Sequence, residues 1–285
     1  MKLLGFTLII ISAISFGLMP IFATFAYKSG LDIRTILLSR FLIAATLINI
    51  YILIKKHSYP KGKLLVILIF MGAVLYSAQA FSYFTAVSLI GSSLTSILLY
   101  LYPSIVLVLS VILLKTRVHK LDMTALVLTT IGAILVVGIK FENINLIGVI
   151  FGIMAALIYS FYIIIGTKAM SGTSPVVATG VVIASSASIY VLYGLSAGVD
   201  FPQNIEQWKW IFYISIVSTI IAIIAFFAGL KLIGPVKSSM ISTFELVVTL
   251  FCSYLFLGEK MGYIQIIGSI FILISAIILA KEKDE

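Results

Sequence analysis

The sequence is poor in charge. Asp, Glu, Lys and Arg make up only 10% of its 285 residues, whereas hydrophobic residues make up 62%. A soluble globular domain carries about 25% charged residues, so this chain has too few polar side chains to cover a water-facing surface. The shortage excludes soluble enzymes, nucleic-acid-binding modules and disordered proteins. An integral membrane protein with short loops remains, and its expected surroundings are a lipid bilayer, with no nucleic-acid partner.

Cysteine and histidine are nearly absent. The single cysteine, Cys252, lies in an apolar run and forms no intrachain disulfide, and the 2 histidines, His57 and His119, lie in basic loops. Neither histidine has a Cys, Asp or Glu partner at metal-ligand spacing. The P-loop, H-E-x-x-H and G-x-S-x-G motifs are missing as well. We therefore expect no metal, no cofactor, no ATP-driven step and no catalytic residues.

Long apolar runs fill most of the chain. A helix needs about 20 residues to cross about 30 Å of hydrocarbon. Such helices satisfy their own backbone hydrogen bonds in lipid, whereas an outer-membrane barrel needs alternating segments of about ten residues, which this sequence does not show. The sequence predicts an all-α integral membrane protein with ten transmembrane helices, at 3–26, 34–54, 64–89, 93–114, 121–139, 145–166, 175–197, 209–232, 237–257 and 261–280.

The basic residues between these runs predict an orientation. Lys and Arg cluster at 55–63 and 115–120, and both clusters fall on the same side as the two termini. Loops rich in Lys and Arg face the cytoplasm. We expect a multi-pass protein of the cytoplasmic membrane with both termini in the cytoplasm.

The chain also resembles itself. Leu89-Ile90-Gly91 matches Leu232-Ile233-Gly234, and the same shift in numbering, the repeat shift, aligns Gly5 with Gly148. The repeat shift predicts two repeats, 1–142 and 143–285, with five spans each. Because five is odd, the second repeat is inserted upside down. Inverted repeats are typical of secondary transporters, which alternate access by rocking about a central site.

Short motifs carry a family resemblance along nearly the whole chain. They are Arg40-Phe41, the stretch 86–103 ending at Pro103, and in the second copy the stretch 229–239, Phe244-Glu245-Leu246 and 257–260. With them the chain resembles the EamA family of the drug/metabolite transporter superfamily, although Leu246 replaces an expected proline. The resemblance implies a ten-helix exporter or facilitator of small metabolites, often amino acids, with a central cavity between helices one, three, four, six, eight and nine.

Two ionisable residues lie well inside predicted spans, where charge is costly and therefore indicates function. Glu245 shares one helix face with Ser238, Ser242 and Thr249. It is a candidate for binding a solute amine or exchanging a proton, and a structural carboxyl is the alternative. We expect Arg40 to snorkel to the interface or to hold a backbone carbonyl, with pairing to a solute carboxylate as the alternative.

Polar and aromatic residues on other spans complete the predicted substrate-binding set. Tyrosines near a midplane cavity suit a small amphipathic solute, although their ordinary role is packing with a satisfied hydroxyl. Beside Glu245 and Ser242, the set contains Ser12, Ser15, Tyr76, Gln79, Tyr83, Tyr100, Tyr159 and Tyr162.

The inverted repeat and the buried charges predict a secondary transporter for a small organic solute, either proton-coupled or uncoupled. The family resemblance implies that it exports, or facilitates the movement of, a metabolite such as an amino acid or a similar compound. One alternative is efflux of many cationic drugs, as in small multidrug resistance proteins, which carry a glutamate in span one where this chain has Ser12 and Ser15. A membrane enzyme acting on lipid is a further alternative, but it would need clustered His or acidic residues. We expect a monomer or a homodimer.

Overall fold

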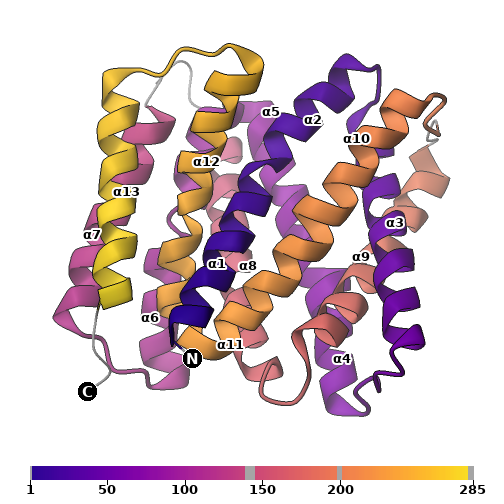
Figure 1. Cartoon of the computed structure of the whole chain (residues 1–285), viewed down its shortest axis with the longest axis horizontal. Coiled ribbons are helices and arrows are strands. Elements are labelled where there is room, and N and C mark those ends of the chain that lie inside the picture. Colours follow the sequence, from indigo (N-terminus) through magenta and orange to yellow (C-terminus); the bar gives the residue numbers. More distant parts are fainter. Residues whose placement is uncertain (1, 139–144, 198–200, 282–285) are drawn as a thin grey trace.

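The molecule is a bundle of helices that run roughly along one direction (Figure 1). The structure is a computed structural model that describes residues 2–138, 145–197 and 201–281. Within these ranges every regular element is helical. The predicted boundary between the repeats, after residue 142, lies outside the described residues.

The first half of the chain contains α1 to α7. These elements are α1 (Lys2–Gly17), α2 (Met19–Lys28), α3 (Ile33–Ile54), α4 (Lys63–Phe70), the π-helix η1 (Met71–Tyr76), α5 (Ser77–Leu99), α6 (Tyr102–Leu114) and α7 (Lys120–Val137). The second half contains α8 (Leu146–Ala169), α9 (Pro175–Ala197), α10 (Ile205–Ser215), the π-helix η2 (Ile216–Ile221), α11 (Ala222–Ser242), α12 (Phe244–Cys252), the π-helix η3 (Ser253–Leu257) and α13 (Tyr263–Lys281).

These elements form ten membrane spans. Nine helical stretches of the described chain are long and apolar enough to cross a membrane, and Phe244–Leu257 is a shorter apolar helix. The longest stretch, Ile205–Ser242, contains a sharp break, because Gly234 leaves the helix at φ 75° immediately before Pro235. The break ends span eight, which covers 205–233. Span nine covers 235–257 and so includes the shorter apolar helix. The predicted all-α membrane fold is therefore confirmed, and α1 begins at the same end of the bundle at which α13 ends (Figure 1).

The two halves pack against each other through equivalent contacts. A Cβ atom on Gly5 would lie 2.5 Å from Cγ2 of Ile233, and one on Gly148 would lie 2.6 Å from Cγ2 of Ile90. The two pairs are related by the repeat shift, with the roles of the halves exchanged. Close approach at small residues is the usual way in which membrane helices associate. The contacts confirm the inverted repeat.

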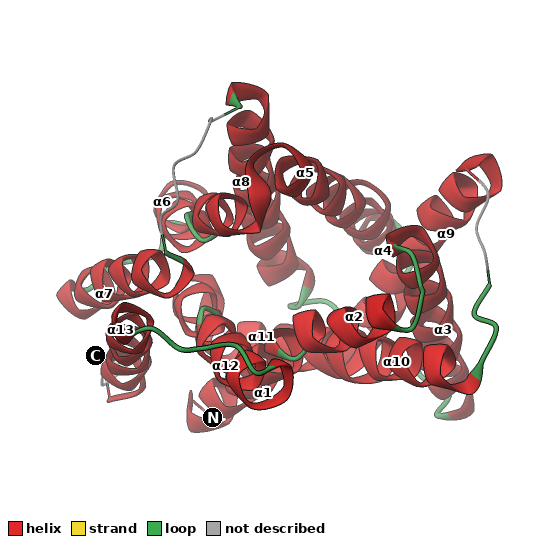
Figure 2. Ribbon diagram, turned by 90° about the horizontal axis from the view of Figure 1, so that it is seen from above, coloured by secondary structure: helices red, strands yellow, loops and turns green. Residues whose placement is uncertain are grey.

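Spans five and ten form a pair at one edge of the bundle. Figure 2 shows α7 and α13 together at the edge opposite α9 and α3. Gly132 and Gly268 face each other, so that a Cβ on either would lie 2.7 Å from the other's carbonyl oxygen, and the hydroxyls of Thr129 and Ser275 are 2.6 Å apart. This peripheral pair leaves the other spans to surround the centre of the molecule.

Three of the remaining spans are interrupted near their middle. Span one breaks at Leu18, before Pro20, and span four breaks between α5 and α6, before Pro103. Span nine breaks at Thr243 without a proline, and the Thr243 hydroxyl donates a hydrogen bond of 2.6 Å to the carbonyl oxygen of Met240. Irregular backbone at membrane depth is tolerated only where it is buried in protein or lines a cavity. The three breaks therefore point to the region between these spans.

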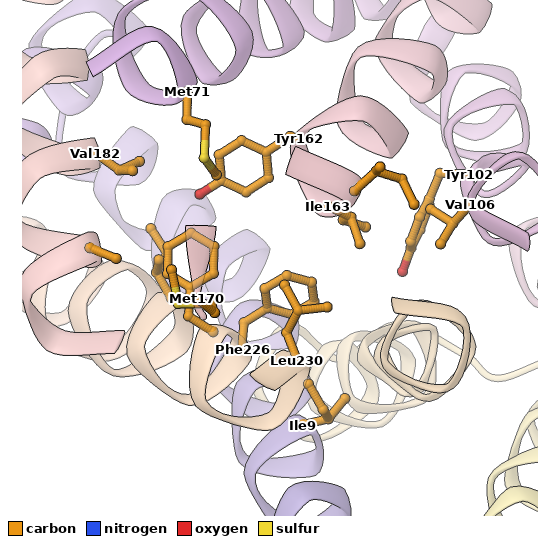
Figure 3. Packing of buried hydrophobic residues seen from close by; sticks show 14 of the residues in the cluster. Ile9, Met71, Tyr102, Val106, Tyr162, Ile163, Met170, Val182, Phe226 and Leu230 are labelled. Atoms are coloured by element: carbon orange, nitrogen blue, oxygen red, sulfur yellow. The ribbon is translucent and has the colours of Figure 1, made fainter. Parts of the chain in front are cut away.

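An apolar cluster fills the half of the bundle near the termini. Met71 of η1, Ile163 of α8, Met170 at the C-terminal end of α8 and Leu230 of α11 belong to this cluster and are buried (Figure 3). Gly166 allows α8 to lie close to η1 and α11, since a Cβ at this position would lie 3.3 Å from both Met71 and Phe227. The cluster closes this end of the bundle.

The C-terminal ends of spans four and nine offer a matched test of backbone strain. Lys115 and Gly258, which correspond under the repeat shift, both end their helix in the left-handed region, at φ 55° and φ 71°. No atom lies within 4 Å of a Cβ built on Gly258, so only backbone strain acts there. A side chain in this conformation costs about 1–2 kcal/mol. We expect Gly258→Ala to destabilise the protein by about 1 kcal/mol and Lys115→Ala to have little effect, as measured by unfolding in detergent. Equal effects would contradict the prediction.

Candidate functional site

A cavity of about 260 Å³ lies between the interrupted spans. It lies between the middle of the bundle and the end away from the termini. Phe16, which contributes to its wall, stands about 20 Å along α1 from Lys2 at 1.5 Å per residue, and Leu37 is close to the opposite end, where α3 begins. Spans one, three, four, six, eight and nine all line the cavity, as the family resemblance implied, and span two lines it as well.

Tyrosines form a continuous row along this cavity. Tyr76 lies 5.7 Å from Tyr162 between ring centroids, and Tyr162 lies 6.1 Å from Tyr159. The row continues from Tyr159 to Tyr102 at 4.8 Å and from Tyr102 to Tyr100 at 6.1 Å. All five rings contribute to the lining. The row supplies an aromatic surface with hydroxyl groups, which suits a small solute that is partly apolar.

Glu245 lies at one end of the tyrosine row. It is the second residue after the break at Thr243, and its carboxylate accepts a hydrogen bond from the hydroxyl of Tyr100. Thr249, one turn further along α12, donates a hydrogen bond of 2.9 Å to the carbonyl oxygen of Gly17 beside the break in span one. Glu245 and Thr249 both line the cavity. The broken helix thus places a carboxyl group on the wall of the cavity.

Arg40 lies at the other end of the row and does not snorkel to the interface. Its side chain is only 7% exposed and lines the cavity. The guanidinium donates hydrogen bonds to Thr219 Oγ1 at 2.8 Å, Tyr76 OH at 3.0 Å and Met19 Sδ at 3.1 Å. The expectation that Arg40 reaches the lipid interface or holds a backbone carbonyl is therefore wrong. Because α3 packs against α10 and η2, this part of span two is inside the protein.

The structure brings together seven of the predicted substrate-binding residues and separates three. The three serines are not among the residues that line the cavity. Ser12 donates a hydrogen bond of 2.8 Å to the carbonyl oxygen of Ala222 between α1 and α11, and Ser15 and Ser242 are buried elsewhere in the bundle. The seven that line the cavity are Tyr76, Gln79, Tyr83, Tyr100, Tyr159, Tyr162 and Glu245.

Arg40 and Tyr102 also line the cavity, but neither belongs to the substrate-binding set predicted from the sequence. The signal for Arg40 was present, since an arginine inside an apolar span is costly unless the protein provides a buried polar site. Tyr102 could have been found from the repeat, because the repeat shift places it at the position of Glu245.

A second hollow of about 580 Å³ lies beside the cavity, between α3, α5 and α9. Leu37 and Phe84 line both spaces and stand between them. The side hollow contains neither Glu245 nor Arg40, so the smaller central cavity is the better candidate site.

The chemistry available in the cavity is recognition by charge and aromatic contact. Glu245 can hold a cation or a proton, and Arg40 can hold an anion. Among residues 2–138, 145–197 and 201–281, no three His, Cys, Asp or Glu side chains gather where they could hold a metal ion.

Comparison with known proteins identifies relatives over most of the chain. It is 25% identical over 276 residues to the uncharacterized transporter YcbK of Bacillus subtilis (strain 168), a match that covers 93% of this chain and 88% of that protein. It is 26% identical over 201 residues to an uncharacterized transporter of Archaeoglobus fulgidus, which covers 70% of this chain and 72% of that protein.

The fold and the repeats are shared as well. A protein of known crystal structure superposes with a TM-score of 0.84 at 16% identity, covering 98% of both chains, and so has the same fold. The model of the EamA-like transporter family matches the sequence twice, over residues 3–138 and 146–281. These two matches take in almost the whole chain, one in each inverted half, and the protein is therefore a multi-pass membrane protein that belongs to the EamA-like transporter family.

Proposed function

We propose that the protein is a secondary transporter that moves a small organic metabolite, an amino acid or a similar compound, across the cytoplasmic membrane by alternating access. The observation that carries this proposal is the cavity of about 260 Å³ between broken helices, with Glu245 and a row of tyrosines on its wall. In secondary transporters, discontinuous helices from two inverted repeats form the substrate site near the midplane.

The closed end of the bundle supports alternating access. The apolar cluster around Met71, Ile163 and Leu230 separates the cavity from the end that holds the termini. With both termini in the cytoplasm, as the basic loops favour, this arrangement is the state that is closed toward the cytoplasm. Rocking of the two repeats would open this cluster and close the opposite end.

The size and charge of the cavity support a small solute. Pockets for drug-sized ligands measure about 300–1,000 Å³, and this cavity lies just below that range. Efflux of many cationic drugs is disfavoured because Arg40 places a permanent positive charge on the same wall.

Transport in proteoliposomes tests the proposal. We expect counterflow of at least one compound from a panel of amino acids, amines, sugars and nucleosides. Ala80→Phe should block it by filling the cavity that Ala80 lines, whereas Val74→Phe, at a position 47% exposed on the same span, should not. If no compound on the panel moves, the proposed transport of a small metabolite is contradicted. If both variants behave alike, the cavity is not the transport site.

A further inference from the structure

We propose that Arg40 is the anion subsite of this cavity and binds a carboxylate of the transported solute, while Glu245 binds a cationic group several bonds away in the same molecule. The proposal rests on the transport function and deepens it by naming the solute class. That class is elongated zwitterions, such as an amino acid with a cationic side chain or a terminal amino carboxylate.

Arg40 carries a positive charge that no acidic residue of the described chain neutralises by a hydrogen bond. A guanidinium stays protonated in proteins and is costly in the membrane interior. The hydrogen-bond partners of Arg40 in the described chain are Thr219, Tyr76 and Met19, all of them neutral. The group also lies 4.8 Å from the ring centre of Phe41. A purely structural buried arginine is ordinarily paired with a carboxylate, so this site is incomplete in the protein alone.

The guanidinium of Arg40 has more N–H donors than the described residues accept from. Arginine has five N–H groups in a planar fork. Thr219 and Tyr76 accept from Nε and Nη2, and the third acceptor is the thioether of Met19, which is weak. Two N–H groups make no hydrogen bond to the residues that the structure describes. A carboxylate matches this fork, and such charge-assisted bonds are about twice as strong as neutral ones.

Arg40 and Glu245 lie at opposite ends of the tyrosine row. Arg40 donates to Tyr76, Glu245 accepts from Tyr100, and three further rings of the tyrosine row lie between these two tyrosines. Along this row the two charged residues are four ring-to-ring steps apart, whereas the carboxylate and ammonium groups of a simple α-amino acid share one carbon atom. A solute that uses both charges must therefore carry them at opposite ends of a chain.

Hydrogen bonds hold Arg40 from two sides. Tyr76 and Thr219, which correspond under the repeat shift, bind it from the first and the second repeat respectively. A guanidinium fixed from both sides is preorganised for a planar anion, which reduces the cost of ordering on binding. Tyr76 and Thr219 are thus positioning residues for the subsite.

Matched ligands test the proposal in the wild-type protein. Lysine, 6-aminohexanoate, cadaverine and norleucine would be measured as competitors in a binding assay on purified protein. Lysine and 6-aminohexanoate carry both charges, cadaverine lacks the carboxylate, and norleucine lacks the distal amine. We expect the first two to bind at least about tenfold more tightly than the last two, the effect of one charged hydrogen bond.

Variants locate the effect at Arg40. Arg40→Gln should weaken lysine binding about tenfold or more and leave cadaverine binding within about twofold. Arg40→Lys, which keeps the charge but loses the fork, should fall between. Arg34→Gln, an exposed arginine at the start of the same helix, is the control. Equal losses for lysine and cadaverine, or equal wild-type binding of all four compounds, would overturn the subsite. If other compounds are transported while these four are ignored, the proposed function stands and this inference fails.

Discussion

Replacing Glu245 by Gln is expected to lower the rate of solute transport by about 10- to 100-fold. The substitution keeps the size of the side chain and its contact with Tyr100 but removes the negative charge from the cavity. A hydrogen bond to a charged group contributes about 1.5–3 kcal/mol, and each 1.4 kcal/mol corresponds to about a factor of ten. Glu206→Gln, at an exposed position in the first turn of α10, is the matched control and should transport normally.

Two assays on the same Glu245→Gln protein separate the two roles of the carboxylate. Exchange of labelled solute under equal pH needs solute binding but no net proton movement, whereas uptake driven by a pH gradient needs both. If Glu245 binds the amine, both activities should fall together. If it carries a proton, exchange should persist while gradient-driven uptake is lost. Normal activity in both assays would show that Glu245 is structural.

Replacing Gly72 by Ala is expected to cause the largest loss of stability among single glycine substitutions. A Cβ at this position would overlap the carbonyl oxygen of Val182 and would lie 2.9 Å from Cβ of Ser185. The first of these atoms is backbone, so η1 and α9 must move apart. Overpacking costs about 1–3 kcal/mol and occasionally more. The shift would also weaken the hydrogen bond of 3.0 Å from Ser186 Oγ to the carbonyl oxygen of Gly72.

Thermal unfolding in detergent measures this effect. About 3 kcal/mol corresponds to a fall in Tm of roughly 6–12 °C for a chain of 150–250 residues, and a similar fall is expected here. Gly262→Ala is the control, because the nearest atom to a Cβ there is Oε1 of Gln265 at 3.6 Å. Similar melting temperatures for the two variants would mean that the contact between η1 and α9 is not tight.

The architecture could be predicted because it depends on length, apolarity and repetition. Runs of about 20 apolar residues have few options other than spanning the bilayer as helices. The repeat shift that matches Leu89-Ile90-Gly91 with Leu232-Ile233-Gly234, together with the odd number of spans in each half, predicted the inverted halves. The break at Thr243 could not be predicted from this pattern, because Leu246 occupies the position at which the first repeat has Pro103.

The candidate site could be predicted only in part, because helical periodicity shows which residues share a face but not which neighbour that face meets. Glu245 and Tyr100 come from different repeats, yet both face the cavity. Ser12 also faces inward, but its neighbour is α11, so its hydroxyl binds a backbone carbonyl. Arg40 lies inside the second span, within α3, as the sequence predicted. The packing of span two against the second repeat determined its role, and no local pattern encodes that packing.

The repeat shift that relates the two halves pairs Arg40 with Ile183 and Glu245 with Tyr102. A homodimer of identical five-helix subunits would have to place every charged residue twice, once on each side of its twofold axis. Fusion of the two copies into one polypeptide removes this restriction, since each copy can then mutate alone. The two halves still share one backbone arrangement, whereas the cavity has a positive residue, Arg40, at one end and an acidic residue, Glu245, at the other. A bound molecule can therefore be held in a single orientation, which a symmetric homodimer could not enforce.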